Sequence, residues 1–222
     1  MRRCARSCPT ATGCRAAGSG SPTRKAGGLT LYALVSLVAL GWLIAAAGRA
    51  PYVELWPPAR WRLLPPPLAM LPACLLVALA LGAPNPLSFG GARPERFDPE
   101  RPGVVGIARH PLLWALVLWA VAHLFANGDL AHALLFGPLG LLALVGMVLL
   151  DRRRRRALGI AAWQRLAARC SGLPFAARLA GRWRPQPGEL DRARLLAGIA
   201  AYLALLALHE PVLGVSPLRG FG

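Results

Sequence analysis

The histidines of this chain are its best candidates for binding a cofactor or taking part in chemistry, because of where they fall in the sequence. His110 and His123 lie thirteen residues apart, about 20 Å along a helix, so they cannot bind one ligand together. His123, His132 and His209 fall near one end of three different apolar segments. An imidazole at membrane depth is costly without a partner, and two neutral imidazoles on facing helices can bind a haem iron axially. We therefore expect a candidate site at the shared depth of His123, His132 and His209.

The polar residues near these histidines also have ordinary structural explanations. His123 and His132 could instead bond to backbone carbonyls or to each other. In the turn between the two segments, Asn127-Gly128 favours positive φ and Asp129 can cap the helix that follows. Glu210 could hold His209 in one tautomer or simply meet water. Both interpretations stay open at this stage.

The elements that must position these histidines are apolar segments of a length that suits a bilayer. The 222 residues are 55% hydrophobic, and the apolar residues are clustered in runs rather than spread periodically. The sequence therefore predicts an all-α polytopic transmembrane helix bundle with five spans. The spans are expected at about residues 29–47, 66–82, 110–126, 130–150 and 193–210, within a membrane domain of residues 27–218.

The positive charge of the chain is distributed unevenly along the predicted topology. A net charge of +17 could indicate a nucleic-acid partner, but 22 of the 26 Lys and Arg residues fall on one side of the five spans. This asymmetry predicts an inner (cytoplasmic) membrane protein with a cytoplasmic N-terminus and the excess charge facing anionic lipid. The bilayer is thus the expected partner, and nucleic acid is not. Asp151 and the five arginines after it are expected to end the fourth span on the cytoplasmic side.

The cysteines and the N-terminal residues carry little functional signal. Five cysteines form no CxxC pair, so we expect neither a metal site nor a structural disulfide. Residues 1–26 mix Gly, Ser, Arg and Cys without an apolar run long enough for a signal peptide. They are expected to form a disordered cytoplasmic tail.

Several sequence motifs resemble the NnrU family. The resemblance extends from about Leu31 to Leu218, and its most specific motifs are Arg109-His110-Pro111-Leu112-Leu113-Trp114, Leu118-Trp119-Ala120-Val121-Ala122-His123-Leu124 and Ala126-Asn127-Gly128-Asp129-Leu130. This family of multispan membrane proteins is named for an association with the expression of nitrite and nitric oxide reductases. The resemblance implies an accessory or regulatory membrane protein of denitrification.

The resemblance also implies a cofactor. The same domain is similar to plant zeta-carotene isomerase, a membrane enzyme with a histidine-bound haem b, so a haem b is implied here. On grounds of depth, His123 and His209 are the expected iron ligands, between the third and fifth spans. Arg109 and His110 form a second polar site that could receive a haem propionate or an anionic cofactor, because the planar fork of arginine suits a carboxylate.

Three other functions remain open from the sequence. One is a haem-dependent cis-trans isomerase of the zeta-carotene type, acting on a hydrophobic small molecule. The Arg109-His110-Pro111 element is also similar to isoprenylcysteine-type membrane methyltransferases, although the acidic pair of those enzymes is replaced by Asp151 and arginines. The third is a haem-free scaffold.

The resemblance finally implies six spans rather than five. Family members usually begin with a further apolar helix that bears a histidine, and residues 1–25 of this chain are polar and unlike it. We therefore expect the first family span to be missing from this sequence.

Overall fold

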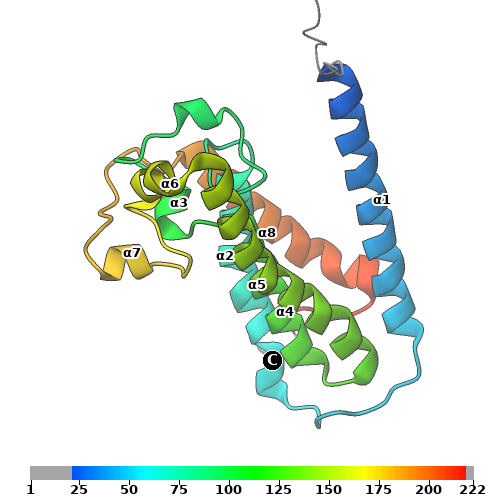
Figure 1. Cartoon of the computed structure of the whole chain (residues 1–222). Helices are drawn as coiled ribbons and strands as arrows, with labels where there is room; N and C mark the ends of the chain where they lie inside the picture. Colours follow the sequence, from blue (N-terminus) through cyan, green and yellow to red (C-terminus); the bar gives the residue numbers. More distant parts are fainter. Residues whose placement is uncertain (1–21, 219–222) are drawn as a thin grey trace, which may run out of the picture. The chain divides into compact units, whose positions relative to one another are not determined.

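The computed structural model describes residues 22–218, and within that range it contains helices and one isolated β-bridge (Figure 1). The chain divides into two compact units, residues 1–45 and residues 46–222. The helices are α1 (Pro22–Arg49), η1 (Arg60–Leu63), α2 (Pro65–Ala80), η2 (Pro94–Arg96), α3 (Val104–Ile107), α4 (Pro111–Asn127), α5 (Leu130–Leu158), α6 (Ile160–Ala167), α7 (Ala176–Leu179) and α8 (Arg192–Leu213).

The apolar segments of the sequence form the long helices. Four of them, α1 from Leu31, η1 with α2, α5 and α8, are long and apolar enough to cross a membrane. The fifth, α4, is shorter at 17 residues, the lower end of the usual range for a span. The prediction of an all-α membrane bundle is thereby confirmed.

Helix boundaries differ from the predicted ones at two places. The α5 helix does not stop at residue 150 but continues through the five arginines to Leu158. The α1 helix begins at Pro22, so the last residues of the predicted tail are helical, while the rest of that tail lies outside the described residues. From Leu31 onward α1 exposes apolar side chains, as expected of a helix whose solvent is lipid.

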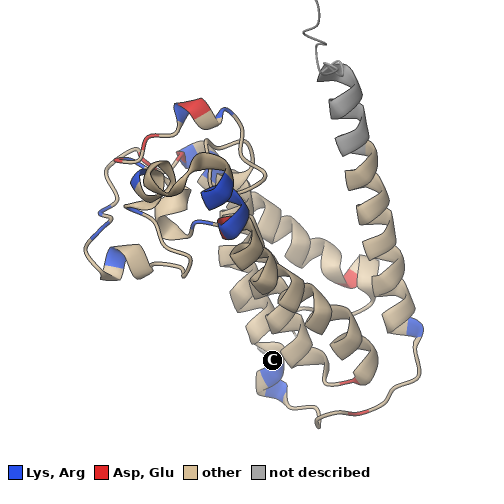
Figure 2. Cartoon of the chain, viewed as in Figure 1, with Lys and Arg blue, Asp and Glu red and all other residues tan. Residues whose placement is uncertain are grey.

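The second unit is a bundle in which α4 packs against both α2 and α5, and α2 packs in turn against α8 (Figure 1). Only residues 128–129 separate α4 from α5, so these two helices run antiparallel, and Arg194 at the start of α8 bonds to the end of α2, so these two do as well. One end of this bundle therefore carries Arg109 and Arg152–Arg156, and we call it the arginine end; the other carries His123, His132 and His209, and we call it the histidine end. Figure 2 shows most charged residues of this unit at the arginine end.

The turn that joins α4 to α5 is fixed by backbone and side-chain contacts. Gly128 has φ +73°, and its carbonyl accepts hydrogen bonds from the amides of Leu55 and Trp56. Asp129 accepts a hydrogen bond from the His132 amide and so caps α5, as the sequence predicts. The same aspartate forms an isolated antiparallel bridge with Glu54. The 53–56 loop is thus anchored to the histidine end.

The contact between α2 and α8 depends on a glycine. A Cβ added to Gly198 would lie 3.1 Å from the Leu75 Cα and 3.2 Å from the Cys74 carbonyl oxygen. Backbone atoms cannot move aside as a flexible side chain can, so any larger residue must separate the two helices. Close approach through small residues is a common way for membrane helices to pack.

We expect Gly198→Leu to lower the stability of the protein by about 1–3 kcal/mol, because it overpacks this contact. The measurement is thermal unfolding of the detergent-purified protein. Gly137→Leu is the matched control, since a Cβ at Gly137 on α5 meets nothing within 4 Å. Equal unfolding temperatures for the two variants would contradict the close packing of α2 on α8.

Candidate functional site

At the histidine end, His123 is held by its own helix. Its Nδ1 lies 2.8 Å from the Trp119 carbonyl oxygen one turn earlier. A carbonyl only accepts, so in the neutral ring Nδ1 carries the proton and donates it, which leaves the lone pair on Nε2. This is the arrangement found in metal-binding histidines, in which one ring nitrogen donates to a carbonyl and fixes the orientation of the other.

His209 is fixed in the same way by a different segment. The α8 helix ends at Leu213, and Gly214 follows with φ +73° in the left-handed conformation that glycine tolerates. The chain therefore folds back, and the Val215 carbonyl oxygen lies 2.7 Å from the His209 Nδ1. Nε2 is again the nitrogen with a free lone pair.

His132 completes this group of imidazoles. Its Nδ1 lies 2.7 Å from the Asp129 carboxylate, which also caps α5. His123, His132 and His209 lie towards the ends of α4, α5 and α8 that form the histidine end. The buried Phe136 packs against both His123 and His132: its ring centroid lies 5.3 Å from that of His123 and 6.1 Å from that of His132. The structure therefore gathers at one end the three histidines that the sequence placed at similar depth.

The donor chemistry of this end suits a haem iron. His123 and His209 come from α4 and α8, which flank α2 and, among the described residues, do not pack directly on each other. Each presents an unprotonated Nε2, which a histidine that would hold a haem iron needs. His132 also presents Nε2, but a carboxylate holds its Nδ1. The assignment of His123 and His209 as the ligand pair stays a prediction.

The arginine end contains a buried polar network that the sequence did not reveal as a unit. His110 is fully buried, with Nε2 3.1 Å from the Asp151 carboxylate and Nδ1 3.0 Å from the Ser88 hydroxyl. Asp151 also forms an ion pair with Arg109. Asn85 donates to the Arg109 carbonyl at 3.3 Å and accepts from the Ser88 amide at 3.1 Å. Three segments are tied together by these contacts: the 85–88 loop, residues 109 and 110 at the start of α4, and the part of α5 around Asp151.

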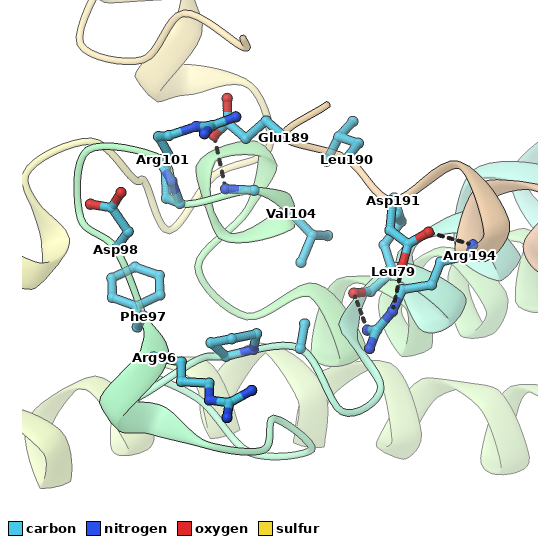
Figure 3. Close-up of a pocket in the computed structure, with 14 residues that line it drawn as sticks. Leu79, Arg96, Phe97, Asp98, Arg101, Val104, Glu189, Leu190, Asp191 and Arg194 are labelled. Carbon is cyan, nitrogen blue, oxygen red and sulfur yellow. Dashed lines mark hydrogen bonds and ion pairs between the residues drawn. The ribbon is translucent and has the colours of Figure 1, made fainter. Parts of the chain in front are cut away.

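Ser88, His110 and Asp151 are the residue types of a hydrolase triad. However, Ser88 is only 2% exposed and His110 is 0% exposed, and neither lines the cavity in Figure 3. A nucleophile must be reachable by its substrate. Both ring nitrogens of His110 are also already bonded, so this histidine offers no lone pair to a metal. The network is therefore structural in this conformation.

Arg109 makes further contacts that occupy its side chain. Its guanidinium lies 4.7 Å from the ring centroid of Trp163 on α6, and Arg155 lies 4.0 Å from the same ring. The predicted second polar site thus exists as a pair of neighbouring residues, but Asp151 and Trp163 already engage the guanidinium. Burial raises the pKa of the nearby Cys170 thiol, so it stays a neutral thiol at neutral pH and is a poor metal ligand.

A separate cavity of about 260 Å³ is lined by the 96–104 segment, the 189–194 segment and the end of α2 (Figure 3). Two of its charged side chains form hydrogen bonds that connect the segments lining the cavity. Glu189 accepts hydrogen bonds from the Gly103 amide and the Trp183 indole, each at 2.9 Å. Arg194 donates to the Leu79 and Leu81 carbonyls at the end of α2. None of the residues predicted to bind a cofactor lines this cavity.

Four residues of these two sites were not assigned to them from the sequence. Ser88 and Asp151 were not linked to His110, because they are 22 and 41 residues away in the chain. Trp119 and Phe136 were not assigned to the histidine end, although each lies four residues from a histidine, at positions 123 and 132. That spacing places each pair on one helix face and could have indicated them.

The fold and the two sites define an integral membrane helix bundle with buried polar groups at both ends. The chain belongs to the NnrU family: the family model described as NnrU protein matches residues 11–217. No curated protein and no solved structure matches it.

We expect Asp151→Asn to destabilise the protein by about 3–5 kcal/mol, because it leaves the buried Arg109 charge without a counterion. The measurement is thermal or denaturant unfolding in detergent. Glu100→Gln is the control that removes the same charge from an exposed ion pair with Arg169, and it should cost about 0–1 kcal/mol. A loss at Asp151 no larger than the loss at Glu100 would show that the buried pair does not hold this end together.

Proposed function

We propose that this protein binds haem b at the histidine end and acts as an accessory protein of denitrification in the cytoplasmic membrane. The observation that carries the proposal is the tethering of His123 and His209. In both, a backbone carbonyl holds Nδ1 and leaves Nε2 free to bind iron. The role in denitrification is supported by membership of the NnrU family.

The surrounding residues support this role by orienting the ligands and excluding water. The Trp119 and Val215 carbonyls hold the two imidazoles in one tautomer, so less ordering is needed when iron binds. Phe136 packs beside His123 and keeps this side of the ring apolar. A bound haem b would supply a redox-active iron at this position. The N-terminus lies on the cytoplasmic side in this proposal, with the arginine end facing the cytoplasm.

The direct test is the absorbance spectrum of the detergent-purified full chain after expression with adequate haem supply. We expect a Soret band that shifts on reduction. His123→Ala and His209→Ala should each abolish it, because each would remove one of the two residues proposed to hold the haem iron. His132→Ala is the matched control from the same cluster and should retain the band. Loss of the band in the His132 variant alone would reverse the ligand assignment, and no Soret band in the wild-type protein would overturn the haem proposal.

The denitrification role is tested separately in cells. Deleting the gene should lower the levels of nitrite and nitric oxide reductases during growth under low oxygen with nitrate. A plasmid copy of the wild-type gene should restore them, and the His132→Ala gene should do the same. Restoration by the His123→Ala gene to the wild-type level would separate the denitrification role from haem binding. Unchanged reductase levels in the deletion strain would refute the role itself.

A further inference from the structure

The five consecutive arginines that follow Asp151 do not share one role in the structure. Arg154 turns toward the bundle, where its guanidinium donates to the Ser88 carbonyl at 3.1 Å. Arg155 lies over the Trp163 ring at 4.0 Å. The other three, Arg152, Arg153 and Arg156, are exposed and form no ion pair or side-chain hydrogen bond with any described residue.

Two of these arginines, Arg152 and Arg156, continue an apolar stripe along α5. Leu142, Val145 and Leu149 are 64%, 45% and 55% exposed and precede Arg152 and Arg156 at alternating intervals of three and four residues. That spacing places all five on one helix face. The face is apolar over the part of α5 that suits the hydrocarbon core and becomes cationic where the apolar sequence ends.

A surface hollow lies at the change from apolar to cationic. It has a volume of about 460 Å³ and is lined by Leu149, Arg152, Arg153, Arg156 and Ala157. Figure 2 shows basic residues covering this part of α5 at the arginine end. Three guanidiniums that have no acidic partner within residues 22–218 surround one hollow, which favours the binding of an anion. Guanidinium forks match phosphate oxygens well.

We propose that this face of α5 binds a single anionic phospholipid. Its phosphodiester headgroup would lie among Arg152, Arg153 and Arg156, and an acyl chain would lie along the stripe from Leu149 toward Leu142. A phospholipid is favoured over a soluble phosphate because the site is half apolar, and only a lipid offers both halves. Basic pockets beside the ends of membrane helices are a recognised setting for anionic headgroups.

The test is native mass spectrometry of the full chain in detergent with added phosphatidylglycerol or phosphatidylcholine. We expect phosphatidylglycerol to be retained preferentially. The triple variant Arg152→Gln, Arg153→Gln, Arg156→Gln should bind it at least about tenfold more weakly, because each arginine contributes to holding the charge. The control is Arg165→Gln, Arg178→Gln, Arg184→Gln, which removes three exposed arginines from other segments and should bind as the wild type does.

Two further measurements keep the outcome decisive. Thermal unfolding of the triple variant should match that of the wild type, because its three side chains form no ion pair or hydrogen bond with a described residue; if it does not, single Arg152→Gln and Arg156→Gln variants should each weaken binding. Glycerol 3-phosphate tests a soluble source of phosphate and should not bind measurably. Equal retention of phosphatidylglycerol by the two triple variants, equal retention of the two lipids by the wild type, or binding of glycerol 3-phosphate as tight as that of the lipid would each overturn the proposal.

Discussion

The ion pair between the buried Arg109 and the partly buried Asp151 is the contact on which the arginine end depends. In surroundings of low dielectric an unpaired charge is very costly, so each group stabilises the other only while both stay in place. His110 bonds to the same carboxylate, which links the start of α4 to the end of α5. The Ser88 hydroxyl on the other side of His110 extends this link to the 85–88 loop. One aspartate thus fixes the relative positions of three segments.

The imidazoles at the histidine end have different hydrogen-bond partners from His110, and this difference decides which rings can bind a ligand. At the arginine end both nitrogens of His110 are bonded to side chains, so the network is closed. At the histidine end, only one ring nitrogen of His123 and of His209, Nδ1, bonds to a backbone carbonyl. The first arrangement stabilises, whereas the second leaves a lone pair on each ring for a ligand. Opposite ends of one helix, α4, therefore carry a structural histidine and a candidate ligand.

The sequence predicted much of the fold because lipid imposes simple rules. A span must be apolar over about 20 residues and must satisfy its own backbone, so hydropathy alone placed the helices within a few residues. It also predicted the Asp129 cap and the separation of His110 from His123, because both depend on local spacing. The α5 helix that contains the fourth predicted span continues past residue 150 to Leu158. The Asp151 carboxylate within it is held by Arg109 and His110, which precede α4.

The sequence by itself determined the class of protein, the positions of its helices and the family, because these follow from hydropathy, spacing and motifs along the chain. Only the tertiary structure decided which polar groups are engaged. It paired Asp151 with residues 41 and 42 positions away and divided a uniform run of arginines into two whose side chains contact other segments, Arg154 and Arg155, and three that form no ion pair or side-chain hydrogen bond with a described residue. The physical reason is that the cost of a buried charge depends on its neighbours in space, and packing brings those neighbours from distant parts of the chain.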